Sequence, residues 1–251
     1  MRTDFAVLLG ILAFAIGSMP VYALTSRGTP DPYDVDDRGG FVLGDFIRRW
    51  FYWFIRPIEW ISLTLRLSPT AFNLLGVAFG VLAGVCFATG RVNLGGWAVL
   101  MGGAADVLDG RIARARGMAD QRGAFLDSTL DRFAEVGAFV GLAVMFRGSA
   151  IALAIVATAL GGSLLVSYAR ARGESLGVVC KVGIMQRAER LLLVGFGGIL
   201  DPAVSAGRGW EGGTLLLWLI GLMAVGTIGT AAYRTVWIAN RLERADASGA
   251  T

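Results

Sequence analysis

Long apolar segments, separated by short polar ones, cover most of the chain after residue 68. The segments are continuous and about 18–22 residues long, the length at which a helix crosses a bilayer, whereas the strands of a closed barrel would alternate apolar and polar positions. The pattern therefore predicts an all-α integral membrane protein. We expect six membrane-spanning helices, at about residues 70–90, 94–114, 123–146, 149–171, 188–206 and 212–240, with the last extending past the bilayer.

A further apolar run lies at the N-terminus, in residues 5–24, preceded by only Arg2 and Asp4 as charges. Val21-Tyr22-Ala23 loosely resembles a signal-peptide cleavage site, so a cleaved leader is one interpretation. The weakly basic start and the length of the run favour an uncleaved extra membrane helix. Residues 25–40 are rich in Pro, Gly and Asp, which predicts a linker, so residues 1–40 form an additional N-terminal unit.

Residues 41–67 combine many aromatic side chains with arginines. This composition is typical of an amphipathic helix that lies in the membrane interface, and we expect Pro57 to kink or split it. The spread of charges argues against a packed transmembrane helix. Ser68 and Pro69 then predict the start of the next helix. The expected organisation is a juxtamembrane helix in residues 41–67, a six-helix catalytic domain in residues 68–245 and a tail in residues 246–251.

The arginines indicate how the protein is oriented. The chain carries 23 Lys and Arg against 19 Asp and Glu, and most of its basic residues fall in the loops on one side of the predicted spans. The other side has little beyond Arg91, Arg147 and Arg208. By the positive-inside rule, the basic side faces the cytoplasm. We expect the protein to lie in the cell (inner) membrane. This clustering explains the net charge of +4 without a nucleic-acid partner.

Four acids lie where the second and third predicted spans of this domain meet. Asp106 and Asp109 are three residues apart near the end of one span, and Asp127 and Asp131 are four apart near the start of the next. Either spacing places both carboxylates on one helical face, and the short turn between the spans allows the four acids to converge. An acid well inside a membrane helix costs roughly 2.5–3.5 kcal/mol, so four of them need a common partner.

A divalent cation fits that requirement. Clustered carboxylates without His or Cys suit Mg²⁺, Ca²⁺ or Mn²⁺, and the chain has no His at all, which excludes His-based acid–base catalysis. One alternative is that the acids merely pair with Arg111, Arg114, Arg116, Arg122 and Arg132 at the membrane edge. Another is an ion or metal transporter, but its acids would lie near the bilayer midplane on several spans. A catalytically silent scaffold is a third, although no motif position is lost.

The run from Asp106 to Asp131 reads D-x-x-D-G-x-x-A-R-x₈-G-x-x-x-D-x-x-x-D. It resembles the motif of the CDP-alcohol phosphotransferases, and every fixed position of that motif is present. The resemblance covers about residues 68–245 and implies a six-helix membrane bundle, a homodimer and an enzyme. Such an enzyme moves a phosphatidyl or related lipid phosphate group from a CDP-linked lipid, such as CDP-diacylglycerol, to a small polar alcohol and releases CMP.

The resemblance also implies roles for the motif residues. Asp106, Asp109 and Asp127 are the expected ligands of Mg²⁺ or Mn²⁺, with two ions expected, and Asp131 is a ligand or the general base. Spacing alone does not distinguish the four acids. A carboxylate held by dications is a weaker base, so the acid farthest from the ions is the better base candidate. The residues expected around the CDP moiety are Gly110, Ala113, Arg114 and Gly123.

A second basic cluster follows the motif. Ser167-Tyr-Ala-Arg170-Ala-Arg172 ends one span, and Arg187-Ala-Glu-Arg190 begins the next, both on the cytoplasmic side. These arginines either form an ordinary basic membrane edge or bind a phosphate on the acceptor. The sequence resembles the phosphatidylinositol-phosphate synthase branch, which implies inositol phosphate as acceptor; glycerol phosphate, serine and inositol are alternatives. The expected acceptor-phosphate residues are Ser167, Arg170, Arg187 and Arg190.

Overall fold

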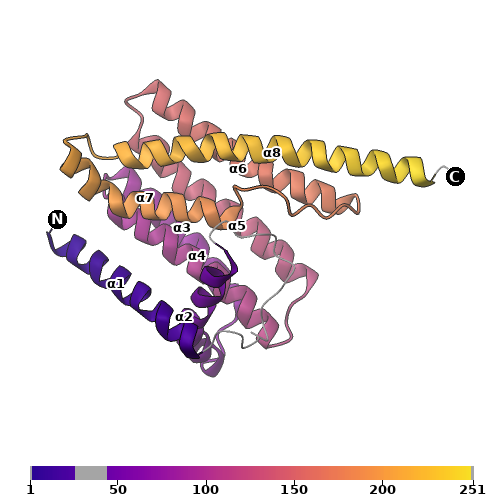
Figure 1. Ribbon diagram of the computed structural model, residues 1–251, viewed down its shortest axis with the longest axis horizontal. Coiled ribbons are helices and arrows are strands. Elements are labelled where there is room, and N and C mark those ends of the chain that lie inside the picture. The colour runs from indigo at the N-terminus through magenta and orange to yellow at the C-terminus, as the bar shows by residue number, and fades with distance from the viewer. Residues whose placement is uncertain (1, 26–43, 250–251) are drawn as a thin grey trace.

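The computed structural model describes residues 2–25 and 44–249, which form eight helices and no strands (Figure 1). This confirms the all-α prediction. By length and composition, four of these helices can cross a membrane: α3, α6, α7 and α8. The helices are α1 (Arg2–Thr25), α2 (Asp45–Thr64), α3 (Pro69–Ala88), α4 (Val92–Ala115), α5 (Gln121–Met145), α6 (Ala150–Ser175), α7 (Arg187–Arg208) and α8 (Thr214–Gly249).

Short polar side chains set several helix starts. The Ser68 side chain accepts a hydrogen bond from the Ala71 amide at 3.2 Å, with Pro69 in the first turn, as the sequence predicts. Asp120 caps α5 in the same way, through the Gly123 amide at 2.6 Å. These caps satisfy backbone N–H groups that have no partner within the helix. They fix where α3 begins and where α5, the helix that carries Asp127 and Asp131, begins.

Helix α2 continues through Pro57, so Pro57 does not split the helix, which was one of the two outcomes that the sequence predicted. A proline removes one backbone hydrogen bond, but packing on both sides of it holds the helix together. Ile55 and Glu59 are buried next to Pro57, and Ser62 is buried one turn further on. The buried face packs against α4, where Ile55 joins the cluster of Leu108 and Ile112.

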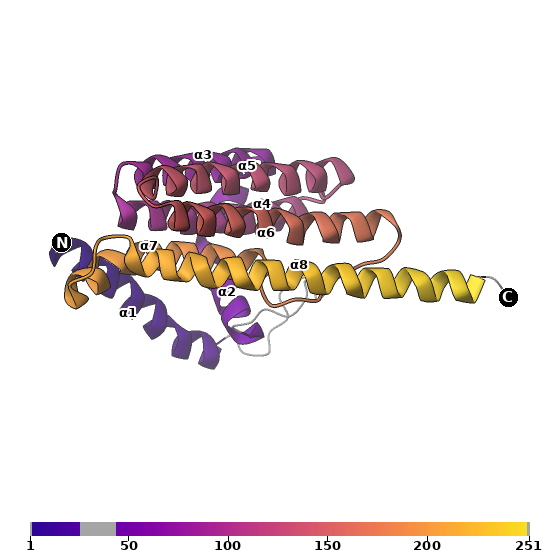
Figure 2. The same ribbon diagram turned by 90° about the horizontal axis from the view of Figure 1, so that it is seen from above.

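Glycines let the membrane helices approach each other closely. A side chain on Gly84 of α3 would collide with the backbone of α5 at Gly137, and one on Gly141 of α5 would collide with Gly84. A similar contact joins α4 and α7 at Gly96 and Gly198. Figure 2 shows the resulting layers: α3 with α5, then α4 with α6, then α7 with α8, and α1 and α2 on the far side. Small residues serve this purpose in membrane helices generally.

Two buried contacts attach α2 to the end of α4. Arg111 Nε lies 2.7 Å from Glu59 Oε2, and its guanidinium lies 4.9 Å from the centre of the Tyr52 ring. Arg111 is 1% exposed and Glu59 4%, so the pair is shielded from water. Arg116 adds hydrogen bonds to the carbonyls of Ser62 and Leu63. These contacts hold the α4 segment that carries Asp109 and Gly110.

Candidate active site

The structure brings three of the four motif acids together. Asp106 and Asp109 come from α4 and Asp127 from α5, and one carboxylate oxygen of each lies within 4.8 Å of the others. Asp109 is 3% exposed, so its carboxylate is not simply solvated. An oxygen-only set at this separation, with no His, suits Mg²⁺ or Mn²⁺. The predicted convergence across the α4–α5 turn is confirmed for these three of the four acids.

Asn73, in the first turns of α3, also reaches these acids. With its amide oriented to donate, Asn73 Nδ2 lies 3.0 Å from Asp109 Oδ2 and 3.3 Å from Asp127 Oδ1. The side chain therefore connects carboxylates from two helices. Sequence reasoning missed it, although it is the one amide side chain within an otherwise apolar segment, residues 71–88.

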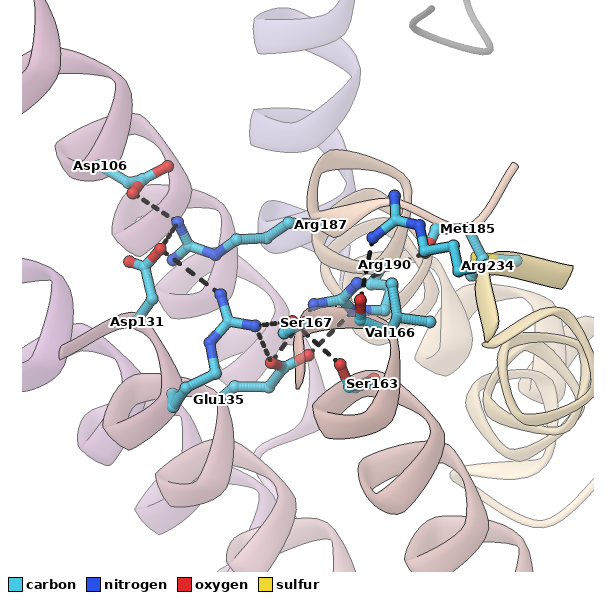
Figure 3. Close-up of polar contacts among 11 residues, drawn as sticks. Asp106, Asp131, Glu135, Ser163, Val166, Ser167, Met185, Arg187, Arg190 and Arg234 are labelled. Carbon is cyan, nitrogen blue, oxygen red and sulfur yellow. Dashed lines mark hydrogen bonds and ion pairs between the residues drawn. The ribbon is translucent and has the colours of Figure 1, made fainter. Parts of the chain in front are cut away.

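Arg187 connects the fourth acid to the others. Its guanidinium pairs with Asp106 on α4 and with Asp131 on α5, as Figure 3 shows. Arg132, which follows Asp131 in the chain, adds a pair to Asp131 at 3.7 Å. The sequence predicted Arg187 for acceptor phosphate, and the structure places it at the border between the acids and the other arginines. Of the arginines named in the alternative of simple ion pairing, Arg132 pairs with a motif acid, Asp131.

Glu135 organises a second group, one turn beyond Asp131 on α5. Arg190 Nε lies 3.0 Å from Glu135 Oε1, and Arg132 lies 3.8 Å from Glu135 Oε2 (Figure 3). Arg132 also donates to Ser167 on α6, whose hydroxyl donates to the Ser163 carbonyl at 3.1 Å. The structure thus brings Ser167 and Arg190 into one network. Sequence reasoning missed Glu135, although an acid inside an apolar helix at i+4 from Asp131 was a usable signal.

Arg234 of α8 lies next to this network and was also missed. It is 3% exposed, and it donates from Nε to the Val182 carbonyl at 2.8 Å and from an Nη atom to the Val166 carbonyl at 2.9 Å. A buried guanidinium held by carbonyls keeps its positive charge near the site. The available signal was an arginine within the apolar last span, where a charge usually has a function.

Arg170 pairs with a residue of its own helix, α6, and in the described contacts it does not join the network around Glu135. Its Nε lies 2.8 Å from Glu174 Oε1, and the two side chains are 47% and 40% exposed. Even so, Arg170 lines the same large cavity, of about 1570 Å³, as the rest of the predicted site. The other predicted residues on its wall are Asp106, Asp109, Gly110, Ala113, Arg114, Gly123, Asp127, Asp131, Ser167, Arg187 and Arg190.

A membrane-helix site with clustered carboxylates on one side and guanidinium groups on the other defines a class of protein. It fits a metal-dependent transferase of phosphate-containing groups. Comparison with known proteins is consistent with this class. The sequence profile of the CDP-alcohol phosphatidyltransferase family matches residues 66–228, and the chain belongs to this family. The predicted resemblance and the prediction of an enzyme of this type are confirmed.

Characterised relatives include phosphatidylinositol phosphate synthases. The one from Streptomyces avermitilis is 34% identical over 223 residues, which cover 85% of this chain and 88% of the relative. The one from Cutibacterium acnes is 40% identical over 143 residues, which cover 55% of this chain and 69% of the relative.

Solved structures agree with the fold. Mycobacterium tuberculosis phosphatidylinositol phosphate synthase (PgsA1) in complex with manganese and citrate has a TM-score of 0.63 at 30% identity, over 72% of this chain and 88% of that one. The same enzyme with CDP-DAG bound has a TM-score of 0.62 at 28% identity, over 72% and 92%.

Proposed function

We propose that the protein transfers the phosphatidyl group of CDP-diacylglycerol to inositol phosphate and releases CMP. The observation that carries the proposal is one cavity whose wall holds both the acid cluster, which pairs with Arg187, and the arginine group. The acids suit a metal-bound diphosphate, and the arginines suit a phosphate on the acceptor. The phosphatidylinositol phosphate synthases of two bacteria among the relatives support the choice of acceptor. Glycerol phosphate, serine and inositol remain alternative acceptors within the same chemistry.

Asp106, Asp109 and Asp127 would hold the metal. The oxygen-only donor set fits Mg²⁺ or Mn²⁺, and we propose two ions. When bound, the metal neutralises negative charge on the diphosphate of the donor. Asn73 would keep the carboxylates of Asp109 and Asp127 in place by donating to both.

Asp131 is the proposed base. It would accept the proton from the acceptor hydroxyl, whose oxygen then forms a bond to the phosphorus of the phosphatidyl group. The bond from that phosphorus to the CMP oxygen breaks, and CMP leaves with the electron pair. Arg187 and Arg132 pair with Asp131 and so orient its carboxylate toward the cavity.

The remaining residues would bind the two substrates. A guanidinium of Arg114 can hold phosphate bidentately, and Gly110 and Gly123 leave room for a nucleotide close to the backbone. The proposed CDP-binding residues are Gly110, Ala113, Arg114 and Gly123. The proposed acceptor-phosphate residues are Ser167, Arg170, Arg187 and Arg190. Arg132, which donates to Ser167, and Arg234, which lines the same cavity, would assist them.

The proposed setting is the inner membrane, with the acid site open to the cytoplasm. Helices α3–α8 would be the six spans of a catalytic domain in residues 68–245. Residues 41–67, with exposed Trp60 and Ile61, would form the interfacial unit, and residues 1–40 an extra membrane helix with its linker. Much of that linker lies outside the described residues. Residues 246–251 would form the tail, and the enzyme would act as a homodimer, as the family resemblance implies.

The test is CMP release by the purified full-length protein in lipid, with CDP-diacylglycerol and Mg²⁺ or Mn²⁺. Inositol phosphate, glycerol phosphate, serine and inositol would be supplied in parallel. We expect release with inositol phosphate that stops when the metal is chelated. Release with another acceptor alone would overturn the acceptor assignment, and no release with any acceptor would overturn the proposed reaction.

A further inference from the structure

The cavity that contains the acids continues into an apolar half. Beyond the acids and arginines, its wall includes Trp97 and Met101 of α4, Phe196 of α7 and Phe51 of α2. Its volume of about 1570 Å³ exceeds the roughly 300–1,000 Å³ of pockets that enclose small ligands. The polar substrates would use the end with the charged residues, because these four side chains carry no charge to pair with phosphate.

Helix α1 supplies part of this apolar wall. Ala15, Ile16 and Met19 line the cavity, and Met19 follows Ile16 by three residues and Ala15 by four, the spacings that bring side chains together along one side of a helix. Residues 66–228 define the family match, so this wall comes from a segment outside it. In Figure 1, α1 runs along one side of the bundle toward α2.

A neighbouring stripe of α1 attaches the helix to α2. The Ser18 hydroxyl accepts a hydrogen bond from Trp50 Nε1 at 2.9 Å, and the ring of Tyr22 lies 5.8 Å from that of Trp53. Phe14 packs edge-on against Phe54 at 6.0 Å. These anchors at positions 14, 18 and 22 recur every four residues, beside the stripe that lines the cavity. The orientation of α1 toward the cavity therefore follows from specific contacts.

We propose that α1 forms the wall of a site for an acyl chain of the lipid donor and selects donors by chain length. The inference rests on the proposed function, because the donor's diphosphate at the acids would place its diacylglycerol part at the apolar end of the same cavity. An apolar wall continuous with a charged site fits an amphiphile with its head at the acids. An acyl chain gains little free energy from moving out of the bilayer into an apolar cavity, because both surroundings are apolar. The shape of the cavity wall therefore decides which chain lengths are accepted.

The experiment uses substitutions on α1 that make the apolar end of the cavity narrower. In the full-length protein, Ala15→Trp and Met19→Trp each place a large ring in the cavity, and Leu24→Trp is the matched control because Leu24 is 88% exposed and does not line the cavity. The kcat/KM for CMP release is compared between CDP-dioctanoylglycerol and CDP-dipalmitoylglycerol. We expect the long-to-short ratio to fall about tenfold in the two cavity variants, with the acceptor KM unchanged, and to stay at the wild-type value in the control.

An unchanged ratio in both cavity variants would overturn the inference, and so would the same fall in the control. A wild-type protein that releases no CMP would instead mean that the proposed function has failed. A second measurement does not depend on the variants folding: CDP-diacylglycerol with a diazirine at the end of one chain is photolysed with the wild-type protein. We expect labelling within residues 13–25 that excess unlabelled donor removes. Labelling that is absent there, or that unlabelled donor does not reduce, would contradict the acyl-chain site.

Discussion

The acid half and the arginine half of the site are built in different ways. The acids occupy two consecutive helices joined by a short turn, and three of them meet within 4.8 Å. The arginine half draws on α5, α6, α7 and α8, through Arg132, Ser167, Arg190 and Arg234. A local arrangement is specified by spacing, whereas a long-range one depends on how four helices pack. We therefore expect the acids to control whether the reaction occurs and the arginines to control which acceptor reacts.

The strongest test of this comparison removes an acid charge. Asp127→Asn and Asp131→Asn should each lower kcat by about a thousandfold or more, because a metal ligand or the base is lost. Titration with Mn²⁺ followed by electron paramagnetic resonance separates the two: we expect Asp127→Asn to weaken Mn²⁺ binding and Asp131→Asn to keep it largely intact. Glu211→Gln, at an exposed loop acid, is the control. Near-normal turnover in either Asn variant, with wild-type thermal stability, would contradict the assigned site.

The next test concerns Arg187, which pairs with two of the acids and lines the same cavity as the other arginines. Arg187→Ala should raise the acceptor KM about 10- to 100-fold, more than the donor KM, since hydrogen bonds to charged groups contribute about 1.5–3 kcal/mol. Its pairs with Asp106 and Asp131 predict a fall in kcat as well. Steady-state kinetics with each substrate varied in turn measures both effects. A fall in kcat with an unchanged acceptor KM would assign Arg187 to the acid half alone.

The two halves also differ in how far the sequence could predict them. Convergence of the acids followed from the spacing of Asp106, Asp109, Asp127 and Asp131 on neighbouring helices, and the structure confirms it for three of the four. The helical architecture followed equally directly from the length of the apolar segments. In both cases the informative positions are close in the chain, so helix periodicity alone relates them.

Long-range partners could not be predicted in this way. Arg190 was expected to bind an acceptor, but its pairing with Glu135, 55 residues earlier, depends on the packing of α5 near α7. Arg234 lies 52 residues from Val182, to which it donates. The absence of a split at Pro57 has a similar cause, because the burial of Ile55 and Glu59 against other helices keeps α2 continuous. Strong tertiary contacts can override the helix propensity of individual residues.

The smallest expected effect comes from Glu135, which touches arginines but none of the motif acids in the described contacts. In Glu135→Gln the amide oxygen can still accept a hydrogen bond from Arg190. The negative charge that pairs with both Arg132 and Arg190 is lost. We expect the acceptor KM to rise about three- to tenfold with kcat and Mn²⁺ binding nearly unchanged, in line with the loss of about 1 kcal/mol of positioning. Glu243→Gln is the control, because Glu243 is exposed on α8 and does not line the cavity. A lower acceptor KM would show instead that Glu135 competes with the acceptor phosphate for Arg190. A large loss of kcat at an unchanged acceptor KM would mean that Glu135 acts in catalysis like the motif acids. That result would contradict the proposal that the acid half and the arginine half have separate roles.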